Sequence, residues 1–235
     1  MTNVLVDHVV VITGAFGILG SATARAAANA GARVALIDRA SSTPPGLLDD
    51  CGPDSVAFAG IDLTDAASAA ATVDAAHGRL GGLDILINIA GAFRWQPVAQ
   101  GDSDTWDLLY SINVKTAVNC SRAALAHIPP HRGRIINIGA NAAIKSGSGM
   151  GPYAAAKAGV HRLTESLAEE QKERGITVNA VLPSIIDTPA NRADMPEADY
   201  SKWVSPAALA AVIVFLASRE AQVITGSLIP VTGRV

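Results

Sequence analysis

The chain has 235 residues, a net charge of −3, and a composition that is 49% hydrophobic, 4% aromatic and 17% charged. This composition excludes a disordered chain and a coiled coil, and it favours a large core of Ala, Val, Ile and Leu. The lack of a basic stripe or a run of like charge argues against nucleic acid or an anionic membrane as a partner. We expect a single domain over residues 1–235.

Targeting and metal-binding signals are missing from the sequence. No lysine or arginine precedes Arg25, so the positive start of a secretory signal is absent. The longest apolar run, residues 207–217, is too short to span a membrane. Cys51 and Cys120 fit neither a disulfide nor a metal pattern, and the histidines are scattered. These features predict a soluble cytoplasmic protein without a metal site.

A glycine-rich loop follows the first predicted strand. Residues 8–13 are a short β-branched run, TGAFGILG comes next, and residues 21–31 have a helical composition. Strand, glycine loop and helix in that order form the dinucleotide-binding fingerprint, with an ordinary turn as the alternative. Gly14 permits the tight turn, Gly17 lets backbone amides approach a pyrophosphate, and Gly20 allows close packing of helix on strand.

The second predicted strand, residues 33–37, ends on Asp38. A carboxylate about 20 residues past the glycines can accept hydrogen bonds from the ribose hydroxyls of adenosine. Because this carboxylate would repel a 2′-phosphate, NAD(H) is expected in preference to NADP(H). Arg39 leaves NADP(H) open, since a neighbouring guanidinium could receive that phosphate.

Strand and helix patterns alternate along the rest of the chain. Further strands are predicted at residues 56–60, 83–91, 134–140, 176–183 and 227–231, and helices at 65–79, 104–127, 153–174 and 206–218. Residues 41–55 predict a loop where another crossover helix would stand. The alternation predicts an α/β fold, namely a single-domain, Rossmann-like, doubly wound parallel sheet flanked by helices. Residues 184–205, polar and interrupted by proline, are typical of a mobile lid over a site.

The stretch SGSGMGPYAAAKAG, residues 146–159, carries the most specific chemistry. Tyr153 and Lys157 are four residues apart, so they share one face of a helix that begins near the tyrosine. An ammonium beside a phenol favours the phenolate, which makes tyrosine a usable proton donor and acceptor near neutral pH. The alternative is an alanine-rich helix with one solvated lysine. Asn113, in another predicted helix, is either a satisfied core amide or a functional hydrogen-bonding group.

The glycine loop, Asp38, the sequence NIAG at residues 88–91, Asn113 and the Tyr153–Lys157 pair together resemble the short-chain dehydrogenase/reductase family. The resemblance covers essentially the whole chain. It implies that Tyr153 is the proton donor, that Lys157 binds the nicotinamide ribose and lowers the tyrosine pKa, and that Asn113 supports the lysine. It also implies a small-molecule substrate and a homodimer or homotetramer that pairs through the helices at 104–127 and 153–174.

The predicted strand ends, the lid and the resemblance together assign contacts with cofactor and substrate. The expected cofactor contacts are Gly14, Phe16, Gly17, Ile18, Leu19, Gly20, Asp38, Arg39, Asp62, Leu63, Asn88, Ala90, Gly91, Tyr153, Lys157, Pro183, Ile186 and Thr188. Asp62 or Thr64 could instead cap the predicted helix at 65–79. Ala140, Met150 and Trp203 are the expected substrate contacts, with a core position equally open for Met150 and Trp203.

Two features depart from the common pattern of the family. The glycines run TGxxGxxG, with Ile18 where a glycine is usual, and Ala140 stands where the family has its catalytic serine. Both departures resemble the dihydropteridine reductase branch, as do residues 138–163, the lid and the ending GSLIPVTGRV. That branch uses NADH to reduce a quinonoid dihydropterin, so the resemblance implies hydride transfer to such a conjugated substrate. Asn88 and Asn113 look like the broader family instead.

The alanine at position 140, expected to face the cleft, bears on the reaction. Carbonyl reduction builds negative charge on oxygen, and removing one donor to that oxygen typically costs about 10²–10³ in rate. A conjugated pterin develops no isolated alkoxide, so tyrosine alone could suffice. The alternatives are a carbonyl or alcohol oxidoreductase in which Asn141, Ser146 or Ser148 supplies the donor, and an NAD(H)-binding sensor without turnover.

Overall fold

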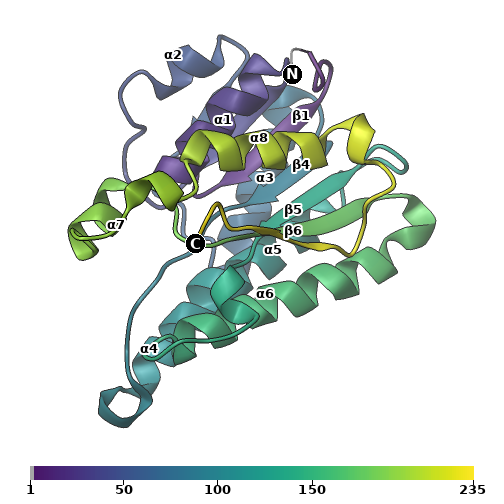
Figure 1. Ribbon diagram of the computed structural model, residues 1–235. Helices are drawn as coiled ribbons and strands as arrows, with labels where there is room; N and C mark the ends of the chain where they lie inside the picture. Colours follow the sequence, from purple (N-terminus) through teal and green to yellow (C-terminus); the bar gives the residue numbers. More distant parts are fainter. Residues whose placement is uncertain (1–2) are drawn as a thin grey trace.

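A seven-stranded parallel sheet forms the centre of the structure, a computed structural model that describes residues 3–235 (Figure 1). The strands are β1 (Val9–Thr13), β2 (Arg33–Ile37), β3 (Val56–Phe58), β4 (Ile85–Asn88), β5 (Arg134–Ile138), β6 (Thr177–Pro183) and β7 (Leu228–Val231). They lie in the order β3-β2-β1-β4-β5-β6-β7, and every neighbouring pair is parallel. The predicted fold class is confirmed. The order reverses between β1 and β4, where open α/β sheets bind ligands.

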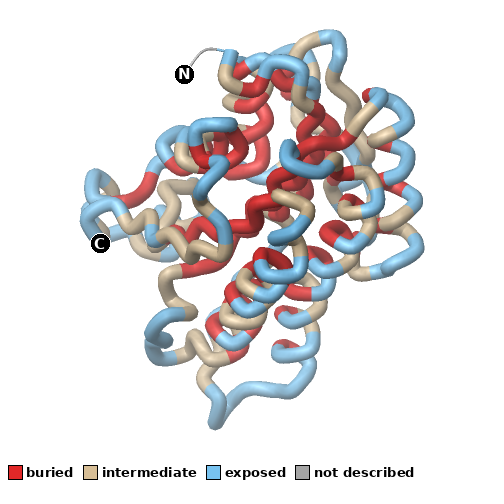
Figure 2. The backbone as a smooth tube through the Cα atoms, turned by 90° about the vertical axis from the view of Figure 1, so that its right-hand side faces the viewer, coloured by how far each residue is buried: buried red, intermediate tan, exposed pale blue. Residues whose placement is uncertain are grey.

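Helices cover both faces of the sheet (Figure 1). On one face lie α1 (Ile18–Asn29) and α8 (Pro206–Ala217); on the other lie α3 (Ala66–Leu80), α5 (Thr116–Ala124) and α6 (Gly151–Glu170). Figure 2 shows burial concentrated in the central strands, with the outer sides of the helices exposed. Burial on both faces explains why the strands read as continuous Val, Ile and Leu runs instead of alternating with polar residues.

Two segments differ from the sequence-based expectation. Residues 41–55, expected as a loop, contain the short helix α2 (Leu47–Cys51), because Leu47 and Cys51 find apolar partners in the core beside α1. The expected helix at 104–127 divides into α4 (Ser103–Tyr110), a π-helical segment (Ser111–Lys115) and α5. Short π-helical segments occur frequently at functional sites, and this one contains Asn113.

Side-chain caps fix several of the helix starts. Asp65 accepts a hydrogen bond from the Ser68 amide at 2.6 Å and caps α3. Ser205 accepts one from the Ala208 amide at 3.1 Å and caps α8, which then begins with Pro206. Such caps satisfy amide groups that the first helical turn leaves unpaired. The cap on α3 is therefore Asp65 and not Asp62.

Across residues 3–235, no helix combines the length and the apolar character that crossing a membrane requires. The same part of the chain holds no group of three or more His, Cys, Asp or Glu side chains suited to a metal ion. Cys51 and Cys120 are both buried free thiols, and burial raises the pKa of Cys120 to about 12.

Candidate active site

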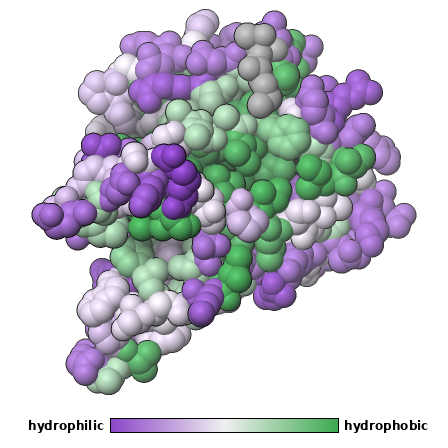
Figure 3. Space-filling model, in the orientation of Figure 1, coloured by the Kyte–Doolittle hydropathy of each residue, from purple (hydrophilic) through white to green (hydrophobic). Residues whose placement is uncertain are grey.

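A cavity of about 1000 Å³ lies along the carboxyl ends of the strands. In Figure 3 the surface is indented at the left, between the polar lid above and the projecting lobe that contains α4 below. The predicted residues that line this cavity are Gly14, Phe16, Gly17, Ile18, Leu19, Gly20, Asp38, Arg39, Asp62, Leu63, Ala90, Gly91, Asn113, Tyr153, Lys157, Ile186 and Thr188. Loops far apart in the sequence thus meet around one space.

The glycine loop forms a backbone cradle at one end of the cavity. Gly14 has a φ of +64°, and a Cβ there would lie 2.7 Å from the Ala90 nitrogen. A Cβ at Gly20 would lie 2.1 Å from the Gly14 carbonyl oxygen. At Gly17 a Cβ would meet only that same oxygen, at 3.6 Å. Gly14 and Gly20 are therefore required by the fold, and Gly17 leaves open space at the start of α1, where the helix favours an anion.

Asp38 is fixed at the edge of the cavity by two backbone amides. One carboxylate oxygen accepts from the Phe16 amide and the other from the Ala40 amide, each at 2.9 Å. Arg39 and Asp62 line the cavity nearby. Hydrogen bonds from the Thr64 hydroxyl and amide hold the pKa of Asp62 below its usual value, with a smaller contribution from Arg39. This end of the cavity thus presents carboxylates and one guanidinium.

Tyr153 and Lys157 enter the cavity from the first turns of α6. The Lys157 ammonium is buried and donates to the Ile138 carbonyl oxygen at 2.7 Å, and it lies 6.0 Å from the centroid of the Tyr153 ring. Burial raises the pKa of Tyr153 to about 12 and lowers the pKa of Lys157 to about 8. The expected lowering of the tyrosine pKa by the lysine is therefore not seen in the protein alone, because burial disfavours both charged forms.

Asn113 ties the π-helical segment to the loop after β4. Its side-chain oxygen accepts from the Ala92 amide at 3.2 Å, and its nitrogen donates to the Ala92 and Leu109 carbonyl oxygens at 3.0 and 2.9 Å. A Cβ on Gly91 would lie 2.6 Å from the Asn113 oxygen and 3.3 Å from the Lys157 nitrogen. Asn113 therefore satisfies its own amide while it positions the backbone beside Lys157.

Three of the expected contacts are buried and do not line the cavity. Asn88 donates to the side-chain oxygens of Asn137 and Ser121 at 2.8 and 3.1 Å, so it is a core amide. Pro183 is buried at the end of β6. Ala140, expected to face the cleft, is only 3% exposed and does not line the cavity.

The remaining expected substrate contacts are Met150 and Trp203. Met150 immediately precedes α6 and does not line the cavity. Trp203 is 8% exposed, and its ring packs at a tilt on Tyr200 with the centroids 4.8 Å apart. Trp203 therefore lies in the core, which is one of the two positions left open for it.

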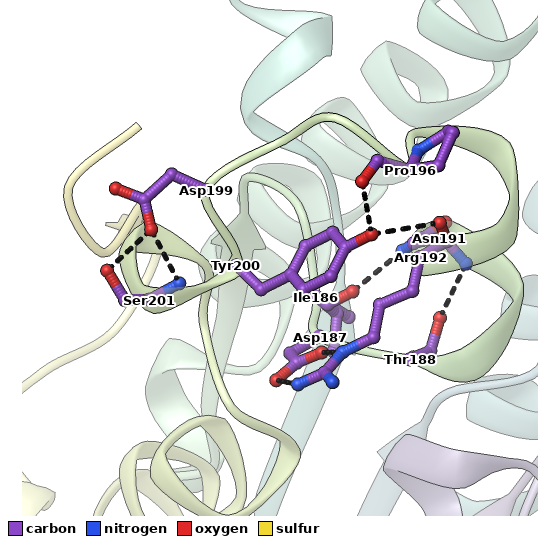
Figure 4. Close-up of polar contacts among 9 residues, drawn as sticks. All are labelled: Ile186, Asp187, Thr188, Asn191, Arg192, Pro196, Asp199, Tyr200 and Ser201. Carbon is purple, nitrogen blue, oxygen red and sulfur yellow. Dashed lines mark hydrogen bonds and ion pairs between the residues drawn. The ribbon is translucent and has the colours of Figure 1, made fainter.

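The lid segment 184–205 has a defined conformation of its own (Figure 4). Arg192 makes two hydrogen bonds to the Asp187 carboxylate, at 2.6 and 2.8 Å. The Tyr200 hydroxyl donates to the Pro196 and Arg192 carbonyl oxygens, at 3.0 and 3.3 Å. These contacts enclose α7 (Pro189–Asp194), whose first turn is capped by Thr188 at the cavity wall.

Phe93 is a cavity residue that sequence reasoning missed. It is 50% exposed, and its ring meets the Tyr153 ring edge-on, with centroids 5.0 Å apart and planes at 87°. The loop that carries it is pinned to residues 146–150, because Trp95 Nε1 donates to the Ser148 carbonyl oxygen at 3.0 Å and the Gln96 amide to that of Gly149 at 2.8 Å. The signal in the sequence was an aromatic residue just past the end of a central strand.

Comparison with known proteins decides the family. A sequence model described as short chain dehydrogenase matches residues 8–199. The chain belongs to the short-chain dehydrogenase/reductase family. It is 32% identical to 2-(S)-hydroxypropyl-CoM dehydrogenase 3 of Xanthobacter autotrophicus, over 99% of this chain and 98% of the relative. It is also 32% identical to the 3-oxoacyl-acyl-carrier-protein reductase FabG of Vibrio cholerae, over 97% of each.

A solved structure agrees with this assignment. The short-chain dehydrogenase/reductase of Brucella melitensis described as a glucose/ribitol dehydrogenase superposes with a TM-score of 0.92, at 27% identity over 99% of this chain and 98% of the other. The protein is thus an oxidoreductase of a family that binds NAD(P). The cradle fits such a cofactor, because Gly17 leaves open space at the start of α1, where a pyrophosphate would approach the backbone.

Proposed function

We propose that this short-chain dehydrogenase/reductase is an NADH-dependent reductase of a conjugated substrate similar to a quinonoid dihydropterin, with Tyr153 as the proton donor. The observation that carries the proposal is the lack of a hydroxyl at position 140, where the structure has a buried alanine. Asn141, Ser146 and Ser148, the possible substitutes, do not line the cavity. A substrate that develops no isolated alkoxide makes a second donor unnecessary.

The residues of the cavity have different roles in the proposed reaction. When bound, the nicotinamide supplies the hydride. Tyr153 keeps its proton at neutral pH because burial raises its pKa to about 12, so it enters the reaction as a donor. Lys157, held on the Ile138 carbonyl, is placed to bind a ribose hydroxyl beside the tyrosine. Phe93 offers an exposed ring next to Tyr153, which suits a flat heteroaromatic substrate.

The preference for NADH over NADPH rests on Asp38. Its carboxylate is anchored by two amides at the cavity edge, so it has little freedom to turn away from a 2′-phosphate. Arg39 lines the same end of the cavity and is exposed, which keeps NADPH as the lesser alternative. Charge repulsion from a fixed carboxylate therefore favours the cofactor without the phosphate.

A carbonyl or alcohol oxidoreductase is the second candidate, and the relatives favour it. FabG of Vibrio cholerae is named as a 3-oxoacyl reductase and the Xanthobacter relative as a hydroxypropyl-CoM dehydrogenase. A non-catalytic NAD(H) sensor is less favoured, because Tyr153, Lys157 and Asn113 all line the same cavity. We propose a homodimer or homotetramer in either case. Exposed Tyr110 and Val118 on α4 and α5, and the apolar area across the middle of Figure 3, support it.

The test is a steady-state NADH oxidation assay with quinonoid dihydropterin and with a panel of ketones, on the native protein and on Ala140→Ser. The proposal expects turnover of the pterin with no gain in kcat/KM from the added hydroxyl. Turnover of ketones alone, raised about tenfold or more by Ala140→Ser, would move the carbonyl reductase to first place. Binding of NADH without turnover of either substrate would favour the sensor.

A further inference from the structure

One face of α6 carries a line of polar side chains along the end of β5, of which Lys157, His161 and Thr164 are buried. Tyr153, Lys157, His161 and Thr164 are spaced by four, four and three residues, so they follow one another on that face. Three of them hydrogen-bond to β5 or to the residues just after it: Lys157 to the Ile138 carbonyl, His161 to the Ala140 amide, and Thr164 to the Asn137 side chain. The line leads from the interior to the cavity.

His161 takes a specific place in this line. Its ring is 3% exposed, and its Nε2 lies 3.3 Å from the Ala140 amide nitrogen. A Cβ on Gly139 would lie 2.5 Å from the same Nε2 and 3.2 Å from Leu182 Cδ1. The imidazole thus occupies the space directly over Gly139, and a side chain at position 139 would displace it.

The Ala140 amide needs this partner. Just after β5, the Gly139 amide still bonds across to β6 and donates to the Val181 carbonyl oxygen at 2.9 Å. The next amide lies beyond the ladder and is buried, and a buried N–H without an acceptor is costly. Nε2 can accept only if the ring is neutral and its proton is on Nδ1.

The surroundings of His161 keep it in that neutral form. Burial, with smaller contributions from Arg162 and Lys157, lowers the pKa of His161 to about 4. Gly139, just after β5, and Leu182, from β6, lie at the same place as the ring and do not titrate. The imidazole therefore remains an acceptor across the neutral range.

We propose that His161 is a positioning residue of the active site. By accepting the Ala140 amide proton at Nε2, it holds the segment after β5 against α6, so that the Ile138 carbonyl keeps Lys157 at the cavity. The structural part of this role is independent of the reaction, and its catalytic consequence rests on the function proposed above.

The structural part is tested on the ligand-free protein. NMR of the protein with 15N-labelled histidine should show His161 at pH 7 as the neutral tautomer with the proton on Nδ1. Hydrogen exchange of the Ala140 amide should be slow in the native protein and in His161→Gln, whose side-chain oxygen can accept the same proton. It should be about tenfold faster or more in His161→Leu, which fills the space without an acceptor. A ring protonated on Nε2, or equal exchange in all three proteins, would overturn the proposal.

The catalytic consequence is tested by NADH titration and kinetics on the same variants. His161→Leu should weaken NADH binding and lower kcat by about tenfold each, and His161→Gln should restore both to within about threefold of the native values. Thr164→Val is the matched control, since it removes a buried hydrogen bond of the same helix face farther from the cavity. It should lower the thermal stability and leave kcat unchanged. An equal loss of kcat in Thr164→Val would reduce the role of His161 to general packing.

The two proposals fail in different ways. If the native protein does not bind NADH, the proposed function is wrong, and the exchange of the Ala140 amide still decides whether His161 holds the segment after β5. If NADH binds and turns over but His161→Leu behaves as the native protein in exchange and kinetics, only the role of His161 is wrong.

Discussion

The two ends of the cavity were predictable to different degrees. At the cofactor end, every expected residue of the glycine loop lines the cavity, together with Asp38 and Arg39. At the substrate end, Ala140, Met150 and Trp203 were expected and do not line it, whereas Phe93 was missed. At the cofactor end, backbone atoms approach one another closely. This close approach requires glycine at fixed positions, so it can be predicted from the sequence. The substrate end is built by loops whose paths depend on distant contacts.

The largest expected effect is a loss of unfolding free energy that differs between two glycines of the same loop. Gly20→Ala puts a methyl group 2.1 Å from a backbone oxygen that cannot move aside, so it should cost about 3 kcal/mol or more of unfolding free energy. Gly17→Ala meets nothing closer than 3.6 Å and should cost about 1 kcal/mol or less. Urea unfolding of both variants is the measurement. Equal losses would mean that the loop adapts and that the cradle is less rigid than its geometry indicates.

The next largest effect is expected on the rate of the chemical step. Tyr153→Phe should lower kcat by about 10²–10⁴, the usual contribution of a positioned proton donor. It should leave the NADH dissociation constant nearly unchanged, because the ring and its contact with Phe93 remain. Single-turnover rates and NADH titration measure the two quantities. A nearly native rate would show that solvent or another group supplies the proton.

Why one end could be predicted and the other could not is clear from particular residues. The strand patterns placed Asp38 at the end of β2, and parallel strands bring such ends to one edge of the sheet. Trp203 lies in a lid whose conformation depends on contacts such as the packing of its ring on Tyr200. Such contacts cannot be predicted from a local sequence pattern. Asn88 was placed at the right strand end, but its side chain turns inward to Asn137.

A smaller effect is expected on the preference for NADH over NADPH, which we place at the cofactor end of the cavity. Asp38→Ala should narrow the preference for NADH over NADPH by about tenfold, because it removes one fixed charge near the 2′ position. Asp62→Ala is a matched control, since that carboxylate also lines the cavity but is engaged with Thr64. It should change the ratio of the two dissociation constants by less than about twofold. Tighter NADPH binding by the native protein would mean that Arg39 governs the site.

The substrate end is probed by a pair of aromatic residues. Phe93→Leu should raise the substrate KM several-fold with little change in melting temperature, because the ring is half exposed in the cavity. Trp203→Phe should do the reverse, lowering the melting temperature by about 2–4 °C for each kcal/mol lost and leaving KM alone. A rise in KM for Trp203→Phe would restore it as a substrate contact.

The smallest expected effect is a pH dependence of stability that comes from His161, the buried histidine beside Ala140. The pKa of His161 is about 4 in the folded protein and near the ordinary 6.5 in the unfolded chain, so the unfolded chain binds more protons between these values. The stability is then complete above about pH 6.5 and decreases as the pH falls toward 4. Between pH 6.5 and 5.5 the loss should be about 1 kcal/mol, measured by urea unfolding at each pH. His161→Gln should remove this part of the slope, because a glutamine does not titrate. An unchanged slope in that variant would assign the acid sensitivity to the carboxylates and to the other histidines, and would mean that burial of the ring does not hold it neutral.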